Sequence, residues 1–221
     1  MINFYDFASF STGVIARVLS NVQVQGVKNL PRAGPVIIAP NHLHMVDPPV
    51  LSAFLPRKIY FMTKQEAWDH SFLGPISRWF EAFPVRRGEV DLAAYRYAIK
   101  LLTEGKALGI FPEGHRSRDG RLQSGQPGAI ILAQRSGAPI VPVGIWGVSD
   151  VLKWPGLIQR RTLHINIGEP YHPATRRREH LPELTSDLMA RIAALLPPDR
   201  GRHPLPETLT PQSEAPERPT G

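Results

Sequence analysis

The segment between residues 41 and 49 reads NHLHMVDPP and holds two histidines and an aspartate. His42, His44 and Asp47 have the side chains of a zinc site, because imidazole and carboxylate groups are good ligands for that metal. Such a site needs further ligands, and the other histidines of the chain form no second paired cluster. We therefore expect no metal, and a metal-dependent hydrolase using these three residues is the less favoured alternative.

His42 and Asp47 can instead form a base and the group that orients it. Asp47 precedes Pro48, an order that predicts an N-cap residue before a helix over PPVLSAFL. If residues 42 to 47 form a tight turn, the Asp47 carboxylate reaches the His42 imidazole and fixes its tautomer. A neutral histidine has the basicity that a base needs at about pH 7. With no cysteine in the chain and no serine predicted beside this pair, we expect the base to act on a substrate hydroxyl.

Short apolar runs rich in β-branched residues alternate with helical patterns along the chain. The runs predict strands over residues 35–40, 58–64, 82–85, 107–111, 139–146 and 162–168. Apolar residues at helical spacing predict helices around residues 92–102, 128–137 and 184–195. Strands separated by helices indicate an α/β domain with a mostly parallel central sheet flanked by helices.

Three polar segments follow predicted strands directly: residues 41–47, 86–88 and 112–120. Ligands of an open α/β sheet bind at the carboxyl ends of its strands. We therefore expect the three segments to share one rim of the sheet and to form one site.

These segments resemble sequence blocks of the glycerophospholipid acyltransferase family, in particular its 1-acylglycerol-3-phosphate acyltransferases. The first block, N-H-x-x-x-x-D, corresponds to Asn41, His42 and Asp47. The second, an apolar stretch leading to an arginine, corresponds to FPVRRG with Arg87 at the arginine position. Arg86 stands where that block often has an aspartate.

The third and fourth blocks follow in the family order. F-P-E-G followed by R-S corresponds to residues 111–117, with His115 in place of the more usual threonine or serine. The apolar run around proline corresponds to residues 138–147. The resemblance covers about residues 20–170 and implies the glycerol-3-phosphate acyltransferase-like fold.

The resemblance implies a function and a set of site residues. It makes His42 the general base and Asp47 its orienter in the transfer of a fatty acyl group to the sn-2 hydroxyl of 1-acylglycerol 3-phosphate, giving phosphatidic acid for phospholipid biosynthesis. The donor would be a co-substrate, acyl-CoA or acyl carrier protein, and no cofactor is implied. The expected substrate-binding residues are Arg87, Glu113, Gly114, Arg116 and Lys64.

Alternatives from the sequence concern the acceptor and the class of protein. Glycerol 3-phosphate or a lyso-aminolipid would use the same fold and dyad with another acceptor. A non-catalytic lipid-binding module is disfavoured because the first and third blocks are intact.

Net charge and composition limit the partners and the cellular location that we expect for the protein. The formal net charge is +7 and the pI about 10.0, which favours an anionic partner without choosing one. Together with the resemblance, it predicts an anionic membrane surface holding the lysophospholipid, and no nucleic acid. We expect a peripheral or monotopic protein on the cytoplasmic face of the cell membrane.

The two ends of the chain have distinct compositions. Phe4, Phe7, Phe10, Val14 and Val18 recur at helical spacing, so residues 1–19 form either an interfacial membrane helix or a helix packed on its own domain. Residues 20–196 are the expected acyltransferase domain. Residues 197–221 are rich in proline without apolar periodicity, and we expect a disordered tail.

Overall fold

The computed structural model describes residues 3–86, 91–174 and 178–201 of the 221-residue chain. Within these residues one sheet of seven strands has the order β1-β7-β6-β2-β5-β3-β4. The strands in chain order are β1 Asn21–Gln25, β2 Val36–Pro40, β3 Ile59–Lys64, β4 Phe83–Val85, β5 Ala107–Gly109, β6 Ile140–Trp146 and β7 Thr162–Ile167.

The sheet is mostly parallel, as predicted. Five adjacent pairs run parallel, and only β6 and β7 pair antiparallel. All six predicted strands are confirmed, with ends shifted by at most two residues. The carboxyl ends of β2, β3, β4, β5 and β6 therefore lie at one edge.

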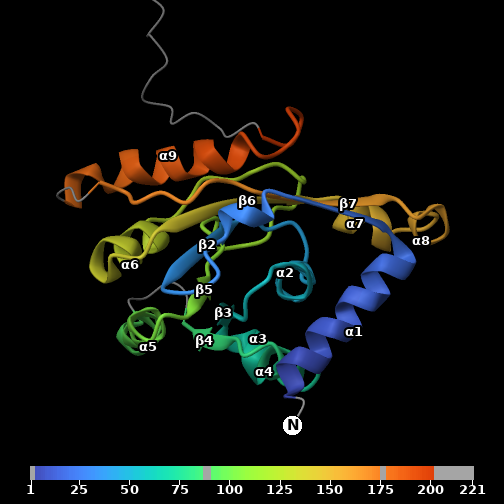
Figure 1. Ribbon diagram of the computed structural model, residues 1–221, viewed down its shortest axis with the longest axis horizontal. Helices are drawn as coiled ribbons and strands as arrows, with labels where there is room; N and C mark the ends of the chain where they lie inside the picture. Colours follow the sequence, from blue (N-terminus) through green and yellow to red (C-terminus); the bar gives the residue numbers. More distant parts are fainter. Residues whose placement is uncertain (1–2, 87–90, 175–177, 202–221) are drawn as a thin grey trace, which may run out of the picture.

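Helices cover both faces of the sheet (Figure 1). Their bounds are α1 Phe4–Leu19, α2 Asp47–Phe54, α3 Gln65–Asp69, α4 Leu73–Trp79, α5 Leu92–Thr103, α6 Gly128–Ser136, α7 Val148–Leu152, α8 Gly156–Gln159 and α9 Leu181–Ala193. One hydrophobic core joins the sheet to α5, α6 and α9, and a second joins its other face to α2 and α7. The helices predicted around residues 92–102, 128–137 and 184–195 are confirmed as α5, α6 and α9, and Gly137 ends α6 with a left-handed conformation.

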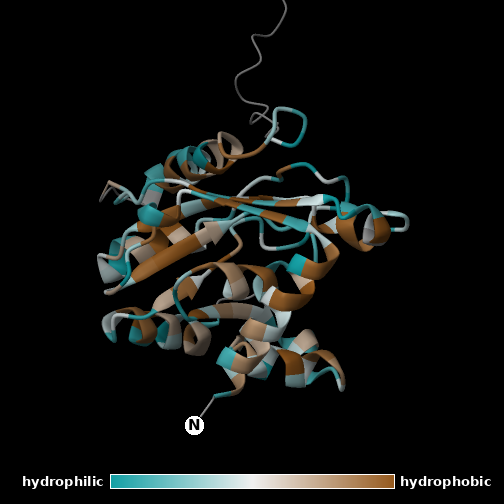
Figure 2. Ribbon diagram, turned by 45° about the vertical axis from the view of Figure 1, so that its right-hand side comes forward, coloured by the Kyte–Doolittle hydropathy of each residue, from teal (hydrophilic) through white to brown (hydrophobic). Residues whose placement is uncertain are grey.

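Burial explains why the central strands were readable from the sequence. Every residue of β2 is buried, as are all but the last of β6, so both read as continuous apolar runs. The outer strand β7 alternates between buried and half-buried positions. Figure 2 shows this contrast, with hydrophobic colour throughout the central strands and alternating colour in the outer ones.

Helix α1 has two faces. Tyr5 and Ala8 are buried against Phe80, and the backbone N–H of Ile59 donates to the Tyr5 hydroxyl at 2.9 Å. The predicted stripe is the other face, because all five of its residues (Phe4, Phe7, Phe10, Val14 and Val18) are exposed. The packed face and the apolar stripe are thus different sides of one helix.

The boundary predicted for the C-terminal tail is too early. Within residues 197–201, Arg200 forms an ion pair with Asp150 at 3.0 Å, and its carbonyl accepts the Leu122 N–H. These bonds order a turn that the proline-rich composition did not indicate. Residues 202–221 lie outside the described residues. Among the helices of residues 3–86, 91–174 and 178–201, none has the length and apolarity required to cross a membrane.

Candidate active site

The first block begins where β2 ends, at the carboxyl edge of the sheet. Asn41 is buried, and its side chain spans to β6: the amide donates to the Ile145 carbonyl at 2.9 Å and accepts the Ile145 N–H at 2.7 Å. This pair of bonds satisfies both amide groups and joins the first block to the fourth. It fixes the start of the loop that carries His42.

Asp47 gathers this loop around one carboxylate oxygen. Its Oδ2 lies 2.9 Å from His42 Nδ1 and accepts the backbone N–H groups of Leu43 at 2.8 Å and His44 at 2.7 Å. The Asp47 side chain is completely buried, whereas the His42 side chain is 13% exposed. The tight turn predicted for residues 42–47 is present, with the orienter against the imidazole.

The prediction that Asp47 is the N-cap of α2 is wrong. Val46 is the residue before the helix, Asp47 is its first residue, and no side chain caps it. The carboxylate instead points back to Leu43 and His44, and its Oδ2 binds those N–H groups and the imidazole, whereas its buried Oδ1 has no hydrogen-bond partner in the described part of the chain. Proline at the next two positions also removes two N–H donors from the first turn.

The third block holds the main chain of His42 from both sides. Glu113 accepts the His42 N–H on Oε1 at 2.6 Å and the Gln123 N–H on Oε2 at 3.0 Å. The Ser117 N–H donates to the His42 carbonyl at 2.8 Å. Burial raises the pKa of Glu113 to about 7, and the charge of Asp47 adds to the rise. Glu113 is thus a buried support of the catalytic loop.

Aromatic stacking fixes the plane of the imidazole. The Phe111 ring, the first residue of the third block, stacks on His42 with centroids 3.9 Å apart and planes 25° apart. Phe61 stacks behind Phe111 at 5.6 Å. A Cβ at Gly109 would lie 2.3 Å from the Phe61 ring, so the glycine leaves room for this stack. His42 therefore has its ring and its main chain held by separate contacts.

These contacts define what the imidazole can do. A carboxylate oxygen that already accepts two N–H groups requires Nδ1 to be the protonated nitrogen, which leaves the lone pair on Nε2. Nε2 can take a proton, and Asp47 stabilises the resulting imidazolium. The arrangement is chemically able to serve as a general base with its orienter.

Two positively charged side chains, Arg116 and Lys153, influence His44 in the loop that holds the dyad. Burial lowers the pKa of His44, Asp47 raises it, and the charges of Arg116, His42 and Lys153 lower it again. Arg116 and Lys153 therefore act on the same loop, although they come from the third block and from the segment after α7. Both cations therefore lie close enough to His44 to lower its pKa.

Known proteins share this arrangement of blocks. A family model described as Acyltransferase matches residues 21–146, which is more than half of the chain. The chain belongs to the acyltransferase family.

Sequence similarity between this acyltransferase and individual relatives covers more of the chain than the family model does. A 1-acyl-sn-glycerol-3-phosphate acyltransferase of Bacillus subtilis is 34% identical over 197 residues, which cover 86% of this chain and 96% of that protein. A chloroplastic protein of the same description from Arabidopsis thaliana is 27% identical over 158 residues, 68% of this chain but 44% of its own length. The solved structure of a Thermotoga maritima 1-acyl-sn-glycerophosphate acyltransferase has a TM-score of 0.68 over 87% of this chain and 78% of that one, at 24% identity, and shows the same fold.

Of the remaining predicted site residues, those that the structure describes lie at the end of β3 or after β5, at the same edge of the sheet. Lys64 ends β3 and pairs with Glu66 at 2.9 Å. Gly114 has a φ of +72° and donates its N–H to the Phe111 carbonyl, so it forms the turn after Glu113. Arg116 is exposed. Arg87 lies outside the described residues.

No metal-ligand cluster accompanies the dyad in the part of the chain that the structure describes. No three histidine, aspartate or glutamate side chains there are placed to hold a metal ion. His42 and Asp47 are bonded to each other, and the His44 Nδ1 accepts the Val46 N–H at 3.4 Å. The three residues of the alternative zinc site thus do not converge on one point.

Sequence reasoning missed three contributors to the site: Asn41, Phe111 and Lys153. Asn41 and Phe111 were recognised as block residues, but their roles depend on neighbours more than 60 positions away. Asn41 bonds to Ile145, and Phe111 stacks on His42. Lys153 lies in no block. Its nearness to His44 follows only from the folded chain.

Proposed function

We propose that this acyltransferase moves a fatty acyl group from acyl-CoA or acyl carrier protein to the sn-2 hydroxyl of 1-acylglycerol 3-phosphate, giving phosphatidic acid. The observation that carries the proposal is the 2.9 Å bond between His42 Nδ1 and Asp47 Oδ2 in a loop held by Glu113 and Phe111. The Bacillus subtilis relative, a 1-acyl-sn-glycerol-3-phosphate acyltransferase that is matched over nearly its whole length, supports 1-acylglycerol 3-phosphate as the acceptor.

The reaction needs one base and no covalent enzyme intermediate. His42 Nε2 takes the proton of the acceptor hydroxyl while the oxygen attacks the thioester carbonyl carbon. A carbon–oxygen bond forms, the carbon–sulfur bond breaks, and the leaving thiolate takes the proton from the imidazolium. Asp47 keeps the imidazole in one tautomer and stabilises its positive charge during the transfer.

The acceptor phosphate would bind to the cations around the dyad. Arg116 and Lys153 already influence the His44 side chain, and a guanidinium fork suits phosphate oxygens. Arg87 has the same role by its place in the second block. Lys64 contributes less, because its ammonium is paired with Glu66.

Glu113 acts through His42 rather than on the substrate. Both carboxylate oxygens accept backbone N–H groups, and the residue is 1% exposed. A glycerol hydroxyl or an arginine would have to displace one of those bonds. We therefore assign Glu113 as a positioning residue, and Gly114 as the turn that aims the rest of the third block.

An apolar cavity beside the dyad would hold an acyl chain. It has a volume of about 290 Å³ and lies between α1, α2, α4 and α7. Val46, the chain neighbour of Asp47, lines it, whereas His42 and Asp47 themselves do not. The other lining residues are almost all apolar and include Ile15, Ala16, Leu19, Pro49, Val50, Ile76, Phe80, Val148, Val151 and Leu152.

The exposed face of α1 would bring the enzyme to its acceptor. Phe4, Phe7 and Phe10 are each more than half exposed on a helix whose opposite face is packed on the domain. Such a helix binds flat in a membrane interface, and basic residues strengthen binding to anionic lipid. We place the protein as a peripheral enzyme on the cytoplasmic face of the cell membrane, where acyl-CoA and acyl carrier protein are present.

A panel of acceptors tests the function. Purified protein is given a thioester donor and either 1-acylglycerol 3-phosphate, glycerol 3-phosphate, a lyso-aminolipid or a phosphate-free monoacylglycerol, and the products are identified by mass. We expect transfer to 1-acylglycerol 3-phosphate well above the others. Transfer only to the phosphate-free acceptor would contradict the role of the cations, and chelator-sensitive hydrolysis without transfer would favour the hydrolase.

A further inference from the structure

A second apolar surface is formed by the segment that connects β6 to β7 in the chain. Leu152, Trp154 and Ile158 are 39%, 75% and 67% exposed, and they lie within residues 152–158 of the α7–α8 segment. We call these three side chains the α7–α8 patch. Large apolar side chains grouped on one surface commonly mark a contact with a partner or a membrane.

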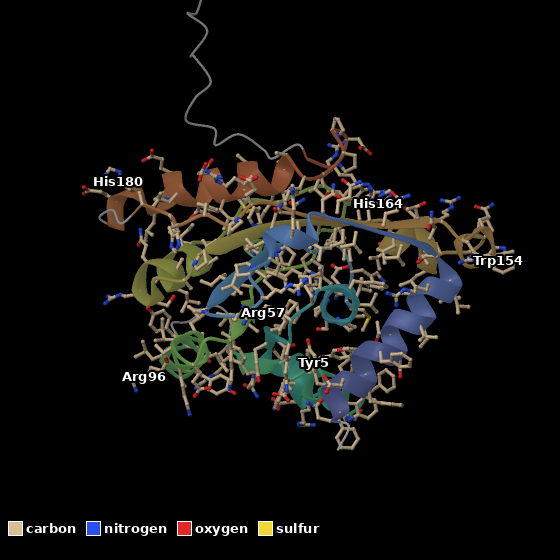
Figure 3. All side chains as sticks on the ribbon, viewed as in Figure 1. Tyr5, Arg57, Arg96, Trp154, His164 and His180 are labelled. Atoms are coloured by element: carbon tan, nitrogen blue, oxygen red, sulfur yellow. The ribbon has the colours of Figure 1, made fainter. Side chains whose placement is uncertain are left out.

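The α7–α8 patch is next to the exposed face of α1. The Arg160 guanidinium, at the end of α8, donates to the carbonyl of Arg17 in the last turn of α1 at 2.8 Å. Leu152 and Ile15 line the same apolar cavity. Figure 3 shows Trp154 at the outer limit of the molecule, beyond the C-terminal end of α1. The two apolar surfaces therefore flank one cavity.

Charge around the patch indicates what covers it. Lys153, Arg160 and Arg161 are exposed, and residues 151–161 contain no acidic side chain. The nearest acid before them, Asp150, is paired with Arg200. A tryptophan among arginines and lysines is the composition that membrane interfaces favour, where the indole lies at headgroup level and the cations contact anionic lipid.

We propose that the α7–α8 patch is a second membrane-docking element, which contacts the same anionic bilayer surface as α1. This inference rests on the proposed interfacial role of α1, and it adds a contact after the fourth block that the sequence pattern did not indicate. With one element on each side, the mouth of the apolar cavity faces the lipid. A bilayer-held amphiphile then enters between Ile15 and Leu152 without crossing water.

Vesicle binding by the full-length protein tests the proposal. The variant Trp154→Ser/Ile158→Ser is compared with wild type and with Leu92→Ser, which removes a 56% exposed apolar side chain on α5, away from this surface (Figure 1). We expect the double variant to partition about tenfold more weakly onto vesicles of equal phosphatidylglycerol and phosphatidylcholine. Leu92→Ser should bind as wild type does. Equal binding by wild type and the double variant would overturn the proposal.

Two further measurements separate a membrane contact from other roles. Brominated acyl chains should quench the tryptophan emission of wild type more than that of Trp154→Phe, and equal quenching would mean that Trp154 stays out of the bilayer. Arg161→Gln should weaken binding to the phosphatidylglycerol vesicles and leave the weaker binding to pure phosphatidylcholine unchanged. If the double variant binds vesicles normally but fails to form a complex with another protein, the patch is a protein interface and the proposal is wrong.

Activity distinguishes failure of this inference from failure of the proposed function. On a short-chain acceptor below its micelle concentration, the double variant should have wild-type turnover, while its turnover on vesicle-held acceptor falls with its binding. Equal loss on both acceptors would contradict a docking role. If no variant and no wild-type protein transfers acyl groups to any acceptor, the proposed function fails, yet the vesicle comparison still decides the docking surface.

Discussion

The His42 loop and the exposed apolar surface differ in what holds their side chains. His42 is fixed by Asp47 from its own loop and by Glu113 and Phe111 from the third block, each at hydrogen-bond or stacking distance. Phe10 and Trp154, in contrast, are more than two-thirds exposed. A side chain fixed by many internal contacts must serve geometry, whereas an exposed aromatic side chain serves contact with something outside the chain.

This comparison predicts two kinds of variant. Changes within the catalytic loop should lower turnover on every acceptor, whether free or held in a bilayer. Changes on the exposed surface should act only where the acceptor is held in a bilayer. A variant of either region that behaves like the other would break the comparison.

The largest effect is expected from His42→Ala. Removal of a general base typically costs a factor of about 10² to 10⁴, and we expect kcat to fall by about 10³. The side chain is partly exposed and the main-chain bonds of residue 42 persist, so thermal unfolding should change little. Acyl transfer and differential scanning calorimetry on the same sample measure both quantities, and near-normal turnover would show that His42 is not the base.

Glu113→Gln should lower kcat by about tenfold with little change in the KM for acceptor, because a displaced His42 loop affects chemistry rather than binding. The amide keeps one acceptor for the two N–H groups that the carboxylate now binds. A raised KM at constant kcat would instead support direct binding of substrate by Glu113. The exposed Glu169→Gln is the matched control, expected to have wild-type kinetics.

The same variant has a predicted pH signature in stability. The pKa of Glu113 rises from 4.5 to about 7 on folding, so the folded state keeps a proton that the unfolded chain releases first. The free energy of unfolding should therefore fall as pH rises from about 4.5 to about 7, by about 3 kcal/mol from this group. Urea unfolding across this range should show a weaker pH dependence in Glu113→Gln. An identical dependence in both proteins would show that Glu113 titrates normally.

Arg116→Ala should mainly weaken acceptor binding, since the side chain is exposed and close enough to the catalytic loop to influence His44. Loss of one charge-assisted contact to phosphate predicts an increase of about tenfold in KM. Arg118→Ala removes an exposed arginine two positions away and should leave KM unchanged. Equal effects of the two substitutions would indicate general attraction by positive charge instead of a phosphate contact.

The smallest effect on chemistry is expected from Phe7→Ser/Phe10→Ser. Both side chains are exposed on α1, so the fold should be kept, whereas deletion of residues 1–19 would remove Tyr5 from the core. Binding to anionic vesicles should fall about tenfold, with unchanged turnover on a soluble short-chain acceptor. Unchanged vesicle binding would remove α1 from the proposed membrane contact.

The predictable parts of the molecule were those that a local pattern determines. The buried strand β2 is a continuous apolar run, and the end of α6 is marked by Gly137. The pairing of His42 with Asp47 also followed from short spacing, because only four residues separate them.

The parts that were missed depend on distant neighbours. The strand β1, with sequence NVQVQ, pairs with β7 across more than 130 positions. Three of its five side chains are exposed glutamine or asparagine, so no apolar run marked it. The carboxylate of Asp47 could have capped α2, and only the positions of the Leu43 and His44 N–H groups decided against it. Glu113 looked like a ligand of the substrate because its burial under the His42 backbone is a tertiary contact.

The most direct test of the central claim is whether His42 and Asp47 act as one unit. Turnover is measured for His42→Ala, Asp47→Ala and the double variant, with phosphatidic acid identified as the product. If Asp47 works only by orienting His42, the double variant should have the same residual kcat as His42→Ala alone. A double variant whose loss equals the product of the two single losses would show independent roles and contradict the dyad.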